Sequence, residues 1–173
     1  MYRHPIVAKA RLFAQMAHGS QQYGTVGPYS VHLEDVERVL AQYTQSDDLK
    51  AAAWLHDVIE DTEYKSLEGH GFPDYVVELV QAVTDEPGKN RKERKAATYK
   101  KIIDVPDAVV LKLADRIANV EACRKNNNNP NLLAMYRSEH PAFLAALRDA
   151  PVTRVKDIRV MWDRLITALR FGP

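Results

Sequence analysis

The sequence has a single cysteine, Cys123, which excludes an internal disulfide and fits a reducing compartment. It also lacks an excess of charge: 24 Lys and Arg residues nearly balance 23 Asp and Glu residues, so no overall field favours nucleic acid or an anionic membrane. No uncharged apolar run approaches a membrane span in length, and the N-terminal segment lacks the apolar core of a signal peptide. We therefore expect a cytoplasmic protein with no nucleic acid or membrane partner; a homo-oligomer is left open.

Helical periodicity is present along almost the whole chain, whereas the alternating pattern of strands is nearly absent. A length of 173 residues is enough for one domain with a real core. Three glycines and a proline predict a loop at 19–29, and a polar, basic connector occupies 85–95. We expect an all-α bundle of roughly eight helices forming a single domain over 1–173. The predicted helices include one that begins at Ser46 or Asp47 and runs to residue 61, one opened by Pro106, and two near 131–148 and 152–170.

The stretch "WLHDVIEDT" at 54–62 gathers one imidazole and three carboxylates on one face of a helix. The same face is apolar one and two turns earlier, at Ala53 and Leu49, so the approach to this stretch should be buried. Buried carboxylates repel one another and are costly to desolvate unless a positive charge lies among them. The helix alone leaves two alternatives open, a solvated polar face and a metal or catalytic site.

Two other positions favour the metal site. His32 begins the helix after the glycine loop, and Asp115 lies inside the apolar helix "AVVLKLADRIANV". A lone histidine is more often structural, but aspartate is unfavourable in a helix interior and is rarely buried without a partner. Two imidazoles and two carboxylates would form a mixed site that suits Mn, Fe, Zn or Mg. Glu60, one turn after His56, could then reach a water molecule as a general base.

The order H…HD…D resembles that of the HD superfamily of all-helical, metal-dependent phosphohydrolases. The segments "HDVIEDT", "LADRIANV" and "AHGSQ…GPYSVH" narrow the resemblance to the hydrolase domain of the RelA/SpoT family and the free-standing small alarmone hydrolases. The likeness covers residues 6–123, whereas the C-terminal helices at 131–170 match only loosely.

This resemblance implies an HD-domain fold and an enzyme that removes pyrophosphate from the 3′ position of guanosine tetra- or pentaphosphate, (p)ppGpp. It implies four ligands for a divalent metal, usually Mn²⁺: His32, His56, Asp57 and Asp115. It implies a catalytic acidic pair that positions and activates the attacking water, Glu60 and Asp61. It also implies three contacts to the nucleotide substrate, at Thr25, Asn119 and Tyr136.

The positions that would recognise the substrate differ from the family pattern. Tyr23 and Gly24 stand where the family typically has Arg-Lys, and Glu121 and Ala122 stand where it often has Arg-Thr. Two alternatives therefore remain: hydrolysis of another nucleotide, such as a nucleoside monophosphate or a deoxynucleoside triphosphate, and a non-catalytic nucleotide-binding module. The basic run at 89–95 is either a solvated charge cluster or, if it folds over the site, a phosphate clamp.

Overall fold

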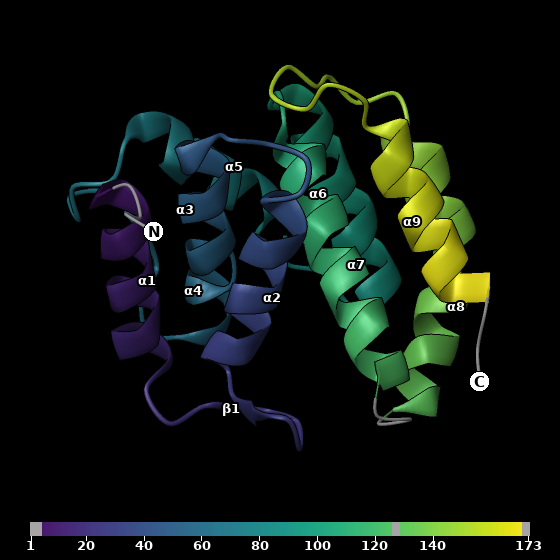
Figure 1. Ribbon diagram of the computed structural model, residues 1–173, viewed down its shortest axis with the longest axis horizontal. Helices are drawn as coiled ribbons and strands as arrows, with labels where there is room; N and C mark the ends of the chain where they lie inside the picture. Colours follow the sequence, from purple (N-terminus) through teal and green to yellow (C-terminus); the bar gives the residue numbers. More distant parts are fainter. Residues whose placement is uncertain (1–4, 126–128, 171–173) are drawn as a thin grey trace.

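The computed structural model describes residues 5–125 and 129–170, and in this part of the chain it is almost entirely helical (Figure 1). The all-α prediction is confirmed. The elements are α1 (Pro5–His18), β1 (Gln22–Tyr23), β2 (Gly27–Pro28), α2 (Ser30–Leu40), α3 (Asp47–Leu55), α4 (Val58–Asp61), α5 (Asp74–Val83), α6 (Arg91–Asp104), α7 (Ala108–Lys125), α8 (Pro130–Leu147) and α9 (Arg159–Arg170).

Helices α3 and α7 lie at the centre of the bundle. Helix α7 contacts α2, α3, α5, α6, α8 and α9, and in Figure 1 it lies between the α1–α4 side and the α8–α9 side. Helix α3 contacts α1, α2, α5 and α7, and its segment from Ala51 to Leu55 has no exposed surface. The prediction that the helix is buried just before its acidic residues, at Leu49 and Ala53, is thus confirmed. Both helices are buried over most of their length, which is typical of helices surrounded by others.

The predicted helix from Asp47 to residue 61 is interrupted, so the prediction of one continuous helix was wrong at this point. Helix α3 begins as expected, with the Ser46 side chain accepting a hydrogen bond from the Leu49 N–H. At Asp57 the backbone leaves the helical region, with φ −100° and ψ −3°, and α4 follows. The interruption turns the Asp57 side chain toward α2. Counting α3 and α4 as one interrupted helix gives the predicted eight; counting them separately gives nine in the described residues.

The last helix is shorter than predicted, because α9 begins at Arg159 and not near residue 152. The segment before α9 is instead held against the start of α7 by Asp107, whose buried carboxylate accepts hydrogen bonds from the N–H groups of Thr153 at 2.7 Å and Arg154 at 2.9 Å. These hydrogen bonds satisfy backbone donors that lie outside any helix. Asp107 itself has φ +67°, a conformation that aspartate tolerates better than most residues, and α7 begins immediately after it, not at Pro106.

Replacing Asp107 by alanine is expected to lower the free energy of unfolding by about 3 kcal/mol, because several buried donors would lose their acceptor. The loss of an aspartate at positive φ adds to this effect. Chemical denaturation measures the change. Asp104→Ala, at an exposed aspartate three residues earlier, is the control and should change the stability by less than about 0.5 kcal/mol. Equal effects of the two substitutions would contradict this account.

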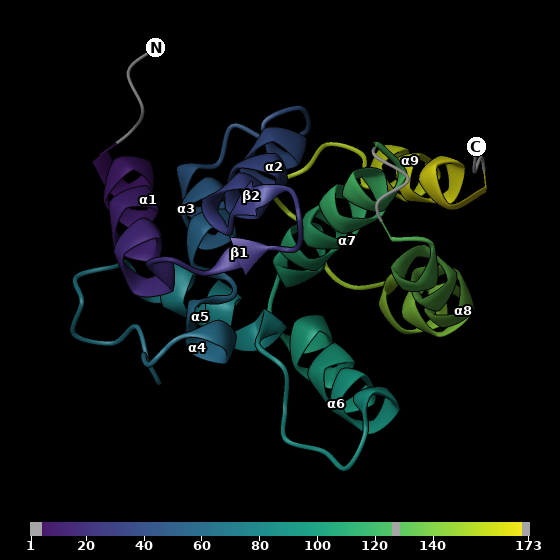
Figure 2. The same cartoon turned by 90° about the horizontal axis from the view of Figure 1, so that it is seen from below.

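The glycine loop forms a short antiparallel hairpin in which Gln22 pairs with Pro28 and Tyr23 pairs with Gly27. The turn requires positive φ at Gly24 and Gly27, which are +53° and +148°. The hairpin lies below α2 in Figure 1, and in Figure 2, seen from below, it is drawn in front of α2. The sequence also predicts a loop in the asparagine-rich stretch 126–130. Most of it falls outside the described residues, although Asn129 caps α8 by accepting a hydrogen bond from the Leu132 N–H. Within the described ranges, no helix is both long enough and apolar enough to cross a membrane.

Candidate metal centre

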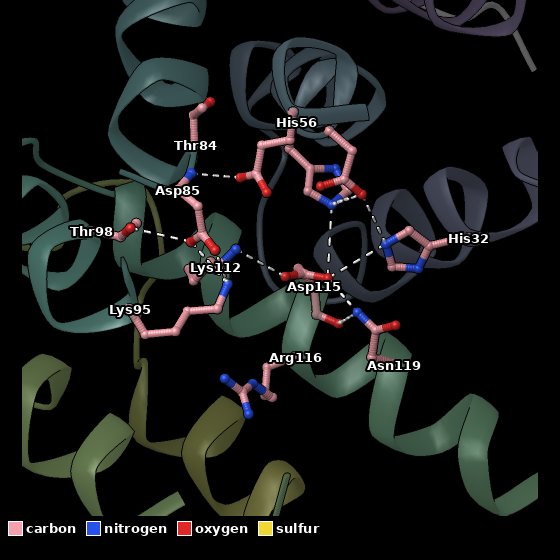
Figure 3. A network of polar contacts seen from close by, with 12 residues as sticks. His32, His56, Thr84, Asp85, Lys95, Thr98, Lys112, Asp115, Arg116 and Asn119 are labelled. Carbon is pink, nitrogen blue, oxygen red and sulfur yellow. Dashed lines mark hydrogen bonds and ion pairs between the residues drawn. The ribbon is translucent and has the colours of Figure 1, made fainter. Parts of the chain in front are cut away.

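Four predicted ligands from three parts of the bundle point toward one another. His32 lies on α2, His56 and Asp57 lie between α3 and α4, and Asp115 lies in the middle of α7. The Nε2 atom of His56 is 3.1 Å from Asp57 Oδ2 and 3.7 Å from Asp115 Oδ1. The Nε2 atom of His32 is 3.6 Å and 3.4 Å from the same two oxygens. Figure 3 shows His32, His56 and Asp115 converging on this point.

The environment of His56 fits a bound cation. Its Nδ1 lies 2.8 Å from the carbonyl oxygen of Ala53, and this contact requires Nδ1 to carry a proton. In the neutral imidazole, the lone pair is then on Nε2, which faces the carboxylates. This Nε2 atom is buried and has no hydrogen-bond partner. A buried polar atom without a partner is unfavourable unless a ligand satisfies it, and a divalent metal would do so.

The electrostatics keep both carboxylates anionic. Burial alone would raise the pKa of Asp57, but the imidazole of His56 and a hydrogen bond from His32 hold that pKa well below its usual range. Burial likewise opposes ionisation of Asp115, whereas the Lys112 ammonium lowers its pKa well below the usual range. For His56, burial lowers the pKa, but the charge of Asp57 raises it well above its usual value. The two anionic carboxylates thus favour a positive charge between them, either a proton on the imidazole or a divalent metal that replaces that proton.

Three further side chains fix the orientation of the carboxylates. The Tyr29 hydroxyl donates to Asp57 Oδ2 at 2.6 Å. Lys112, which is buried, places its Nζ 3.3 Å from Asp115 Oδ2, and Asn119 Nδ2 donates to Asp115 Oδ1 at 2.5 Å. Such contacts around metal ligands set ligand geometry. No role was predicted for Tyr29 from the sequence; it directly precedes α2 and lies three residues before His32.

The predicted acidic pair lies at the mouth of the centre. Glu60 accepts a hydrogen bond from the Asp85 N–H through Oε1 at 2.6 Å, which leaves Oε2 for another partner. Burial by the surrounding protein raises the pKa of Glu60, against the attraction of Lys112. Asp61 is exposed and accepts a hydrogen bond from Gln21 Nε2 at 3.3 Å. Glu60 and Asp61 line the same cavity as the predicted ligands His32, Asp57 and Asp115.

Four basic side chains line the opposite wall of this cavity, which has a volume of about 210 Å³. Lys112 and Arg116 come from α7, and Arg91 and Lys95 come from α6. Part of the predicted basic run thus begins a helix and folds against the site, as the phosphate clamp requires. We call this cavity, with the metal centre at one side and these four cations at the other, the phosphate cavity.

Each cation of the wall has an internal acidic partner. Lys95 is 2.9 Å from Asp85. Arg91 and Arg116 share Glu139 of α8, at 2.5 and 2.9 Å. The cations are therefore held in place before any ligand binds, which is the preorganisation expected of an anion site.

The three predicted nucleotide contacts occupy different places. Asn119 and Tyr136 line the phosphate cavity, and the Tyr136 ring lies against the Arg116 guanidinium at 4.6 Å. Thr25 lines a neighbouring cavity instead, on the other side of the hairpin residue Tyr23. The structure thus brings together the predicted ligands, the acidic pair, Asn119 and Tyr136, and places Thr25 next to them.

The fold and this site define an all-helical protein with a mixed histidine and carboxylate centre suited to a divalent metal. The family model described as "HD domain" matches residues 10–139, and the chain belongs to this family.

Known relatives agree with this assignment. The chain is 34% identical over 121 residues to the guanosine-3′,5′-bis(diphosphate) 3′-pyrophosphohydrolase of Aquifex aeolicus, a match that covers 66% of this chain and 17% of that protein. It is 36% identical over 121 residues to the bifunctional (p)ppGpp synthase/hydrolase SpoT of Escherichia coli, covering 65% of this chain and 17% of that protein. The matched region therefore spans about a sixth of the length of these relatives.

A solved structure also shares the fold over almost its entire length. It is described as a metazoan ortholog of SpoT that hydrolyzes ppGpp. The superposition gives a TM-score of 0.76 with 24% sequence identity, and it covers 96% of this chain and 97% of that chain. The C-terminal helices α8 and α9, whose sequence matched the family only loosely, are thus part of the shared fold.

Proposed function

We propose that this protein is a metal-dependent nucleotide phosphohydrolase that releases pyrophosphate from the 3′ position of (p)ppGpp, with Mn²⁺ as the working metal. The observation that supports this most strongly is the convergence of His32, His56, Asp57 and Asp115 on one point, with a buried, unpartnered imidazole nitrogen among them. The names of the relatives supply the substrate class.

The residues around the centre would have three different roles in hydrolysis: metal binding, acceptance of a proton and orientation of the attacking water. A divalent metal, held by the two imidazoles and two carboxylates, would polarise the phosphate and lower the pKa of water at the site. Glu60 accepts the proton of the attacking water through the oxygen that Asp85 leaves open, and its raised pKa makes it a stronger base than an ordinary glutamate. Asp61, beside it on α4, orients the same water.

The basic wall would bind the phosphates that are not attacked. Lys112 is buried, yet the charges of Asp115 and Glu60 raise its pKa against the effect of burial, so it remains an ammonium. Arg91 and Arg116 can bind phosphate oxygens in the manner in which they now bind Glu139. The reacting group is thus held between the metal centre and a row of fixed positive charges, which stabilise negative charge that develops on the phosphate oxygens.

The second candidate is hydrolysis of a different nucleotide. The observation in its favour is the absence of charge at Tyr23 and Gly24, the positions where the resembled family has basic residues. A nucleotide panel assayed with Mn²⁺, with pyrophosphate and inorganic phosphate measured separately, distinguishes the two candidates. Pyrophosphate from ppGpp is the expected result. Inorganic phosphate from a mononucleotide, with ppGpp untouched, would refute the proposed substrate and support the second candidate.

A further inference from the structure

Tyr23 separates the phosphate cavity from a second cavity. Its ring stacks on the His32 imidazole, with the ring centroids 4.9 Å apart. Its hydroxyl donates to Asn119 Oδ1 at 2.8 Å, across 96 residues of sequence. Burial raises the pKa of this hydroxyl, so it keeps its proton and acts as a donor. The residues that Tyr23 contacts line the phosphate cavity, while Tyr23 itself lines the second cavity.

Asn119 is held by hydrogen bonds on both sides of its amide while Tyr23 is bound to it in this way. Its Nδ2 donates to the Asp115 side chain at 2.5 Å and to the Asp115 carbonyl at 3.2 Å. Its Oδ1 accepts from Tyr23 and keeps one free lone pair. Because Tyr23 lies on the residues that line the phosphate cavity, a nucleoside that extends from that cavity into the second one must displace Tyr23.

The second cavity has a volume of about 190 Å³ and suits an uncharged group. Its walls come from the hairpin residues 23–26, from Ala122 and Cys123 of α7, and from Asn129 and Leu132 at the start of α8. Among the described residues that line it, none carries a charge at neutral pH, because burial raises the pKa of the Cys123 thiol. All the basic groups lie on the far side of Tyr23, in the phosphate cavity.

We propose that Tyr23 is a specificity-determining gate: the nucleoside part of a substrate must displace Tyr23 from Asn119 and then extends its uncharged end into the second cavity. This inference rests on the proposed function for the identity of the reacting group. Phosphoanhydrides without a nucleoside bind only in the phosphate cavity and leave the gate closed. The gate thus selects among nucleotides, because only a nucleoside that replaces the contacts of Tyr23 can open it without a loss of affinity.

The hairpin that bears Tyr23 is suited to such a movement, because its strand pairing is short. Each of its strands has two residues, and the pairing is limited to Gln22 with Pro28 and Tyr23 with Gly27. A Cβ atom added to Gly24 would meet no atom within 4 Å, so there is open space beside this residue of the turn. Displacing the ring breaks the hydrogen bond to Asn119, the stack on His32 and an edge contact with Tyr29, which a nucleoside can replace with contacts of its own.

Tyr23→Phe tests the gate, because it removes the hydroxyl and keeps the ring. Calorimetric titration of the Mn²⁺-loaded protein with GDP measures nucleoside binding without turnover, since GDP has no 3′ phosphate. The dissociation constant for GDP is expected to fall about 5-fold, since a hydrogen bond no longer has to be broken. Binding of inorganic pyrophosphate and the Mn²⁺ content should not change. Tyr43→Phe, which removes a hydroxyl that accepts from Arg164 at 3.4 Å outside both cavities, is the matched control and should leave both titrations unchanged.

Other outcomes would overturn the gate. Unchanged or weaker binding of GDP by Tyr23→Phe would contradict the gate. A loss of Mn²⁺ from this variant would show that Tyr23 instead supports the position of Asp115 through Asn119. Tyr23→Ala, which removes the ring as well, should also bind GDP more tightly than the unaltered protein. Weaker binding there would mean that the ring holds the nucleoside directly. Turnover of ppGpp by the unaltered protein is a separate measurement: if it is absent while Tyr23→Phe still binds GDP more tightly, the proposed function fails and the gate stands.

Discussion

Replacing Asp57 by alanine is expected to abolish both metal binding and hydrolysis. Asp57 Oδ2 lies 3.1 Å from His56 Nε2 and 3.6 Å from His32 Nε2, so it would bind the same metal ion as the two imidazoles. Loss of a residue that only orients a ligand typically lowers metal affinity about 10–100-fold, and loss of a ligand lowers it more. We expect the Mn²⁺ content of the purified variant, measured by elemental analysis, to fall below about a tenth of the normal value, with turnover lost in parallel.

The matched control is Asp74→Ala, at an exposed aspartate in the first turn of α5, which should keep both the metal and the activity. The circular dichroism spectrum of Asp57→Ala should remain helical, since the bundle core does not include this side chain. A variant that loses the metal and still binds its nucleotide with full affinity would contradict the enzyme proposal. That result would favour a nucleotide-binding module that does not use the centre.

Glu60→Gln is expected to lower kcat by about 10²–10⁴-fold and to leave the metal content unchanged. Glutamine retains an oxygen that can accept the Asp85 N–H, so the position of the side chain is preserved while its basicity is lost. The measurement is kcat for the hydrolysed nucleotide, beside elemental analysis of both proteins. Asp61→Asn serves as the comparison, because Asp61 is assigned to orient the water and not to take its proton, so its substitution should have the smaller effect. A Glu60→Gln variant with normal kcat would assign the base to another residue.

The pH profile adds a second readout for Glu60. A general base acts in its deprotonated form, so activity should fall as the pH falls through its pKa. Because burial raises the pKa of Glu60, this acid limb should lie above the usual range of a glutamate, and the glutamine variant should lose it.

Most of the helical fold could be predicted from sequence, because the pattern of apolar residues follows the period of a helix. The burial of Ala53 and of the rest of α3 is one example, since a helix that is apolar all round must lie inside. The grouping of His32, His56, Asp57 and Asp115 could be predicted only because their order resembles a known motif. Nothing in their spacing along the chain requires that α2 and α7 bring His32 and Asp115 together.

The features that the sequence did not predict depend on contacts between distant residues. The segment 152–158 has apolar residues at helical spacing, but it is irregular, and its Thr153 N–H binds the Asp107 carboxylate, 46 residues earlier. The helix interruption at Asp57 accompanies a hydrogen bond from Tyr29, 28 residues away. The role of Tyr23 depends on Asn119, which is 96 residues away. Local propensity contains no information on such partners.

The position of the metal centre, between α2, the α3–α4 junction and α7, has a consequence for the stability of the protein. A cation held there would connect segments of the chain that are separated by 24 and 58 residues, from His32 to His56 and from Asp57 to Asp115. A ligand that binds only the folded state shifts the unfolding equilibrium by mass action. The melting temperature would therefore rise with the concentration of available metal, as the catalytic rate would. Protein made when metal is scarce would unfold, and be degraded, more readily than metal-loaded protein.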